Sequence, residues 1–66
     1  MQAEPIPNPA VEATISVERA GRLLGISRPS AYRAARSGEL PSLRLGRRVV
    51  VPTAAILRLL QIDEAR

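Results

Sequence analysis

Cysteine, histidine and lysine are absent from the 66 residues of this chain, and Tyr32 is its only aromatic residue. Without cysteine, neither a disulfide nor a thiolate metal site can stabilise the domain. Without histidine, the chain lacks the commonest metal ligand and general base. The fold must therefore depend on apolar packing. One aromatic side chain also provides no stacking platform of the kind used by proteins that bind RNA or single strands.

Long apolar runs are missing as well. No stretch of the sequence approaches the roughly 18 apolar residues that a membrane-spanning helix needs. The first residues lack the positive charge followed by an apolar run that marks a secretory signal peptide. We therefore expect a cytoplasmic protein.

The acidic residues show no arrangement typical of catalysis. Six carboxylates are scattered along the chain, and only Asp63 and Glu64 are neighbours. The sequence has no phosphate-binding glycine loop and no pairing of a nucleophile with a base. We therefore expect a protein that is not an enzyme, with no cofactor, no metal and no small-molecule ligand.

Charge of one sign predominates. Ten positive residues, all of them arginine, face six acidic ones, which gives a net charge of +4. Arginine suits bidentate contacts with phosphate and guanine. Coding in a GC-rich genome would equally explain why arginine replaces lysine. The excess of positive charge nevertheless favours a polyanionic partner.

The N-terminal part differs from the rest in composition. Residues 1–13 contain alternating prolines (Pro5, Pro7 and Pro9) and no arginine. Alternating proline prevents a helix, so we expect a disordered tail. Because this tail has no arginine, we expect it to be poorly suited to bind DNA. We predict one domain over residues 14–62 and a short C-terminal tail over residues 63–66.

Two helices separated by a tight turn are predicted at the start of this domain. Ser16 is a suitable N-cap for the first helix, and Gly25 ends it in the left-handed conformation. Ser27 begins the second helix immediately, and Gly38 ends it. This spacing is the helix-turn-helix pattern, whose second helix fits the major groove of DNA. Within the first helix, Gly21 should cost about 1 kcal/mol relative to alanine.

The pattern then changes to a period of two, which indicates a β-hairpin. Leu43 and Leu45 alternate with polar residues before the turn formed by residues 46–48, and Val49 and Val51 follow it. In this interpretation Arg44 points away from the core of the hairpin.

Pro52 ends the second strand and opens a third helix that extends to about residue 62. We expect its inner face to carry four apolar residues, Ala55, Ile56, Leu59 and Leu60. Leu57 and Ile62 are left facing away from that stripe. The predicted fold is α+β and mostly helical: a winged helix-turn-helix with three helices and a two-stranded hairpin wing.

The candidate DNA-binding residues share an outward position and a hydrogen-bond donor. On the second helix they are Arg28, Ser30, Tyr32, Arg33 and Arg36. On the wing they are Arg44, Arg47 and Arg48. Donors on a helix suit base edges and phosphates, and a basic hairpin tip suits a minor groove or the DNA backbone. The alternative is that these are ordinary solvated side chains, as we expect for Arg19 and Arg22 on the first helix.

Residues 15–60 resemble the excisionase-type winged helix of the MerR superfamily. The resemblance rests on LLGISR at 23–28, YR at 32–33, SGELP at 37–41 and RLGRR at 44–48. It implies a second helix in the major groove and a wing on the adjacent minor groove. The sequence departs from the family pattern at Gly21, where alanine is common, at Arg19 and Arg22, where acids are frequent, and at Val50, which is often basic.

Three functions remain open at this point. The resemblance implies an excisionase-like protein that binds and bends double-stranded DNA at the nucleoid to favour excision by an integrase. A small transcriptional regulator with the same fold is an alternative, and a protein-interaction module without DNA binding is another. One module reads few base pairs, so we also expect cooperative self-association on DNA, with Leu57 and Ile62 as possible contacts.

Overall fold

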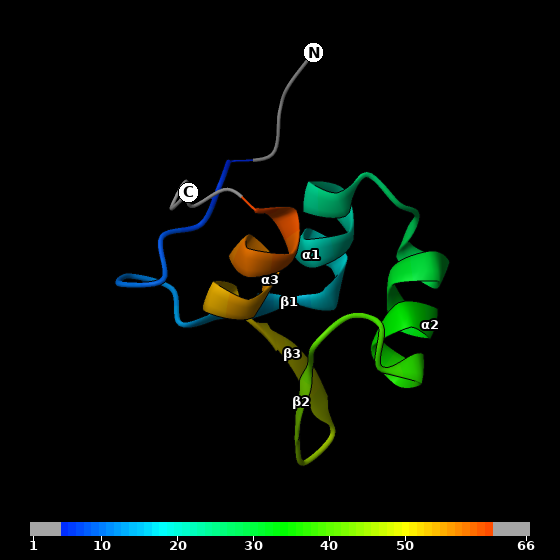
Figure 1. Ribbon diagram of the computed structural model, residues 1–66. Coiled ribbons are helices and arrows are strands. Elements are labelled where there is room, and N and C mark those ends of the chain that lie inside the picture. Colours follow the sequence, from blue (N-terminus) through cyan, green and yellow to red (C-terminus); the bar gives the residue numbers. More distant parts are fainter. Residues whose placement is uncertain (1–4, 62–66) are drawn as a thin grey trace.

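The computed structural model describes residues 5–61, and within them the chain forms three helices and three short strands (Figure 1). In chain order these are β1 (Thr14–Ser16), α1 (Val17–Leu24), α2 (Arg28–Ser37), β2 (Leu43–Leu45), β3 (Arg48–Pro52) and α3 (Thr53–Leu60). Helices α1 and α2 lie next to each other, and the β2–β3 hairpin projects away from the helices.

The boundaries of α1 and α2 agree with the sequence prediction. The Ser16 side chain accepts a hydrogen bond from the Arg19 backbone N–H at 3.0 Å, which caps the start of α1. Gly25 ends this helix with a φ of 76°. Ser27 caps α2, and Gly38 ends it with a φ of 91°, a conformation that favours glycine. Local capping chemistry therefore determines both ends of the turn.

Helices α1 and α2 approach each other closely at Gly21. A Cβ atom at this position would lie 2.9 Å from the Cβ of Ala31, which is itself fully buried. Glycine at position 21 is therefore unfavourable for the helix itself, but its missing side chain leaves room for α2.

Strand β1 is a part of the fold that we did not predict. It pairs with β3 in antiparallel fashion, with Ile15 opposite Val51, so β3 is the central strand of a sheet with the order β1-β3-β2. Three residues are too few to show a period of two, and their partner strand lies more than 30 residues further along the chain. We expected a two-stranded sheet, whereas the structure has three strands. The wing is the β2–β3 hairpin, which extends beyond the end of β1.

The hairpin turn is shorter than predicted. Leu45 pairs with Arg48, so the loop consists of Gly46 and Arg47 alone. Gly46 has a φ of 64°, which two-residue hairpin loops commonly require at their first position. Arg48 therefore lies at the start of β3 rather than in the turn.

The prediction of which side of the hairpin faces the core was right for β3, where Val51 is buried and Val49 packs against the core, and wrong for β2. Leu43 and Leu45 are 46% and 61% exposed, whereas Arg44 lies opposite Val49 on the side that faces α2. The core position that we expected β2 to fill is taken by Leu40, which precedes the strand and is 1% exposed. The Leu40 N–H donates to the Ala34 carbonyl at 3.0 Å, which brings this leucine back onto α2.

The predicted inner face of α3 was partly wrong. Thr53 and Ile56 are fully buried, Leu57 and Leu60 are half-buried, and Leu59 is 47% exposed. These positions follow a spacing of three and four residues from Thr53, a polar residue that a search for apolar residues passes over. Leu57 is half-buried but is not among the side chains that pack against the core, and Ile62 lies outside the described residues.

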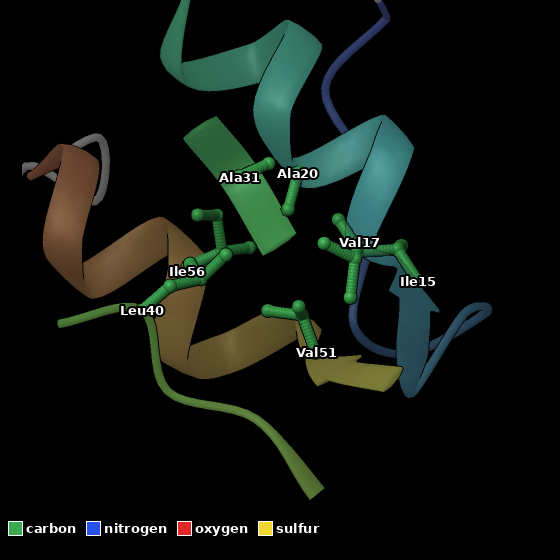
Figure 2. Close-up of a cluster of buried hydrophobic side chains, with 7 residues drawn as sticks. All are labelled: Ile15, Val17, Ala20, Ala31, Leu40, Val51 and Ile56. Atoms are coloured by element: carbon green, nitrogen blue, oxygen red, sulfur yellow. The ribbon is translucent and has the colours of Figure 1, made fainter. Parts of the chain in front are cut away.

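One apolar core joins the three helices to β1 and β3 (Figure 2). Its fully buried or nearly buried members are Ile15, Val17, Ala20, Ala31, Leu40, Val51 and Ile56. They come from every helix, from β1 and β3, and from the segment between α2 and β2. The architecture is a winged helix-turn-helix, which confirms the predicted fold class.

The described part of the predicted tail makes contacts with the domain. Glu12 pairs with Arg19 of α1 at 2.6 Å, and Arg19 also donates to the Pro5 carbonyl at 3.3 Å. The Thr53 N–H donates to the Ala13 carbonyl at 2.9 Å. Arg19, which we expected to be solvated, has a side chain that is only 19% exposed. The prediction for Arg19 was wrong because it considered α1 without the segment that covers it.

Candidate nucleic-acid interface

Helix α2 presents its positive side chains to solvent and its small ones to α1. Ala31 is buried, whereas Arg28, Tyr32, Arg33 and Arg36 are exposed. Ser30 is half-buried. Small inner residues let the helix lie close to α1, so its backbone is held firmly while its outer face remains accessible. An α-helix of this length measures about 15 Å.

Glu18 of α1 is a residue of this surface that we did not identify from the sequence. Tyr32 donates its hydroxyl hydrogen to Glu18 Oε2 at 2.7 Å, and the Arg28 guanidinium lies 3.3 Å from the same oxygen. Arg28 also lies over the Tyr32 ring, 5.8 Å from its centroid. In the sequence, Glu18 stood out only as an acidic residue in the first turn of a helix, so nothing indicated contacts with a residue 14 positions away.

The hydrogen bond between Tyr32 and Glu18 affects both acidities. It lowers the pKa of Glu18 below its ordinary value, and the positive charge of Arg28 acts in the same direction. The same hydrogen bond raises the pKa of Tyr32, because the phenol proton is shared with a carboxylate. At neutral pH the glutamate is therefore ionised and the tyrosine is protonated.

The start of α2 uses its serines for local structure. Ser27 Oγ accepts from the Ser30 N–H at 3.3 Å and donates to Ser30 Oγ at 3.0 Å. Arg33 donates from Nη2 to Ser30 Oγ at 3.3 Å. Ser30, which we proposed as a DNA contact, thus has its hydroxyl engaged within the helix, while Arg33 remains exposed and partly oriented by that contact.

A groove of about 340 Å³ separates α2 from the wing. Its lining residues come from both elements: Tyr32, Ala35, Arg36, Ser42, Arg44 and Val49. Arg36 and Arg44, predicted separately from the helix and the strand, are thus brought to the same groove. Two guanidinium groups there favour an anionic occupant.

A second hollow of about 370 Å³ lies between the wing and the start of α1. Arg47 and Arg48 line it from the wing, and Glu18 and Tyr32 line it from the helices. Tyr32 belongs to both hollows, so it occupies the boundary between them. Of the predicted residues, Tyr32 and Arg36 of α2 and the three wing arginines therefore border these adjoining hollows, whereas Arg28, Ser30 and Arg33 line neither.

The structure also shows where the predictions do not converge. Arg48 lies opposite Leu45, on the face of the hairpin away from Arg44.

Among the described residues, no three histidine, cysteine or acidic side chains are grouped as a metal site would require. In the same part of the chain, no helix has the length and apolar character needed to cross a membrane.

Comparison with known proteins identifies a family for this chain. A family model described as a helix-turn-helix domain matches residues 14–61, which is most of the chain. No curated protein and no solved structure gives a significant match. The matched residues include α1, α2, the hairpin and α3.

Proposed function

The chain belongs to the helix-turn-helix domain family, and from this premise we propose that it binds double-stranded DNA through α2 and the wing. The observation that carries the proposal is the region formed by α2 and the hairpin. Arg36 and Arg44 line its groove, Arg47 and Arg48 border the adjoining hollow, and Arg28 and Arg33 are exposed on the helix. Arginine side chains from two elements on one continuous surface suit the closely spaced phosphates of a duplex.

In the proposed complex, α2 enters the major groove. Arg28 and Arg33 then reach base edges, Tyr32 contacts a base or a phosphate, and Arg36 and Arg44 hold the backbone between helix and wing. Arg47 and Arg48 lie against the adjacent minor groove or its phosphates. The Ser30 hydroxyl contributes by orienting Arg33 and makes no direct contact with DNA in this arrangement.

The specific role we propose is that of an excisionase-like protein, which bends DNA and biases an integrase towards excision. Support comes from the resemblance of residues 15–60 to that family and from the small size of the interface. A single module buries roughly 600–1,000 Å² on DNA and reads only a few base pairs. Several copies on adjacent repeats would provide the missing selectivity and would bend the duplex between them. A transcriptional regulator would bind in the same way but would act without a recombinase.

The experiment that tests the function is selection of duplexes from a random pool with the purified protein, followed by titration of the selected site at several salt concentrations. We expect an affinity that falls steeply with salt, since each phosphate contact contributes about 0.9 to the slope of log K against log salt. Absence of salt-dependent binding to any duplex would reject DNA binding and favour the protein-interaction module. Bending of a selected site that contains repeats would favour the recombination role over the regulator.

Arg33→Ala tests the placement of α2 in the major groove. If Arg33 reads a base, the variant should lose roughly 1–3 kcal/mol of preference for the selected site over random DNA. The comparison requires competition between the two duplexes at one salt concentration. An equal loss on both would reassign Arg33 to the phosphate backbone.

A further inference from the structure

Glu18 places a negative charge inside a region that otherwise presents arginine. Of the three acidic side chains in the described residues (Glu12, Glu18 and Glu39), only Glu18 has described contacts with α2. Its carboxylate also borders the hollow lined by Arg47 and Arg48. A negative charge in this place repels phosphate and offsets the charge of Arg28, so on electrostatic grounds alone it weakens binding to every duplex.

The same carboxylate fixes the direction of two side chains on α2. It accepts the Tyr32 hydroxyl hydrogen at 2.7 Å and lies 3.3 Å from the Arg28 guanidinium. Arg28 additionally rests over the Tyr32 ring. The Arg28 side chain is 70% exposed, so without these contacts it would be free to reach phosphates in many directions. Ordering a long side chain before binding reduces the entropy lost in the complex, but only for the geometry in which it is held.

We propose that Glu18 is a specificity-determining residue of the DNA interface, because it holds Tyr32 and Arg28 in one orientation and thereby favours one base sequence at the expense of general affinity. This inference rests on the proposed DNA binding. Glu18 acts as a positioning residue through its two partners on α2. The arrangement discriminates by lowering the affinity for competing duplexes as well as by matching the correct one.

The charge and the positioning role of Glu18 predict different effects of Glu18→Gln on the preference for the selected site. If Glu18 is only a charge, the variant binds selected and random duplexes more tightly by the same factor. If Glu18 positions its partners, the variant binds random DNA at least as tightly but loses preference for the selected site by at least about fivefold, in the range of one base contact. Glu39→Gln is the matched control, since it removes the same charge from an exposed residue after α2.

Tyr32 provides an independent measurement of the contact. It is the only tyrosine, and the chain contains no tryptophan, so ultraviolet absorbance at alkaline pH reports the ionisation of this phenol alone. In the unmodified protein the phenol should ionise above its ordinary pKa, because its proton is bonded to Glu18. In Glu18→Gln the pKa should move back towards about 10, the ordinary value for tyrosine, and in Glu39→Gln it should not change.

A third variant separates positioning from direct contact of Glu18 with DNA. Tyr32→Phe removes the hydroxyl group, and with it both the hydrogen bond to Glu18 and any contact of that hydroxyl with DNA, but leaves both charges in place, so it should reduce discrimination without tightening the binding to random DNA. In the double variant Glu18→Gln, Tyr32→Phe, the loss of discrimination should be smaller than the sum of the losses in the two single variants, since both changes break the same contact.

The outcomes distinguish this inference from the proposed function. Equal tightening on both duplexes, in Glu18→Gln as in Glu39→Gln, would overturn the positioning role and leave DNA binding intact. An unchanged tyrosine pKa in Glu18→Gln would also overturn it. Failure of the unmodified protein to bind any duplex would overturn both proposals. Reduced discrimination together with a lowered tyrosine pKa would support the role of Glu18.

Discussion

The spacing between α1 and α2 is determined by two small side chains, Gly21 and Ala31. A Cβ at Gly21 would come within 2.9 Å of the Ala31 Cβ, closer than two such atoms approach without movement of one helix. Ala31 is fully buried and belongs to a rigid helix, so the clash cannot be relieved by rotation of a flexible side chain. Since α2 carries the proposed reading residues, this contact also determines where they are aimed.

Gly21→Ala should therefore destabilise the protein, although alanine is the better helix former. Propensity alone would stabilise α1 by about 1 kcal/mol, whereas overpacking of this kind costs about 1–3 kcal/mol. We expect a net loss of about 1 kcal/mol in the free energy of unfolding, measured by denaturant titration.

Exchange of the two residues provides the control. In the Gly21→Ala, Ala31→Gly double variant the total of side-chain atoms at the contact is restored. The double variant should be more stable than the sum of the two single changes implies. An increase in stability for Gly21→Ala alone would contradict the close approach.

For single residues, the sequence predicted which side chains of α2 are exposed, but it did not predict which residues of other elements contact them. Arg28, Tyr32, Arg33 and Arg36 could be placed on the outer face because the helix period is local. The role of Glu18 could not be inferred, since it depends on how α1 crosses α2. The burial of Arg19 was missed for a different reason, because its partner, Glu12, lies in a segment without a periodic pattern.

At the scale of elements, the wing is a hairpin whose two faces serve different purposes. Arg44 and Val49 face α2, whereas Leu45 and Arg48 lie on the opposite face. Arg47 occupies the two-residue turn at the tip of the hairpin, which projects away from the helices (Figure 1). Such a wing can place positive charge on either side of a phosphate backbone.

Replacing Arg47 and Arg48 together by alanine should weaken the binding to all duplexes and leave the preference for the selected site nearly unchanged. Loss of two phosphate contacts should reduce the magnitude of the salt slope by about 1.8. The measurement is the affinity for selected and random DNA at several salt concentrations. Arg58→Ala, which removes an exposed charge from α3, is the control and should leave the slope near its original value. An unchanged slope in the wing variant would exclude the wing from the interface.

Elements with local signals were predicted more accurately than those defined by pairing. Capping by Ser16 and Ser27 and termination by Gly25 and Gly38 determined the limits of α1 and α2. Strand β1 has no such signal, because three residues form a strand only when β3 is already in place. The side of β2 that faces the core was also mistaken, since Leu40 is buried where the alternating leucines of that strand were expected to be.

At the scale of the whole molecule, the division into a tail over residues 1–13, a domain over residues 14–62 and a C-terminal tail stays a prediction. The structure adds that residues 5–13 run along the domain and contact α1 and α3 through Arg19 and Thr53. These contacts lie on elements other than α2 and the wing. In the described part of the N-terminal segment, these contacts favour packing against the domain over contact with DNA.

The small size of the molecule leads to the last prediction, which concerns the number of copies on a natural site. One helix and one wing on roughly 600–1,000 Å² cannot distinguish a site from the many competing sequences of a genome. We therefore expect that a selected sequence contains repeats, that protection from nuclease extends over all of them together as protein is added, and that the duplex becomes bent. Footprinting over a range of protein concentrations, combined with a gel assay of bending, measures these properties.

A single short footprint at saturation would contradict this prediction. The contacts between copies would then need to be reconsidered as well, because Leu57 is half-buried and offers only part of its side chain to a neighbour. Cooperative protection would instead require another surface. Exposed apolar side chains that the structure describes, such as Leu59 on α3, are the positions where a substitution should reduce cooperativity without changing the affinity for one repeat.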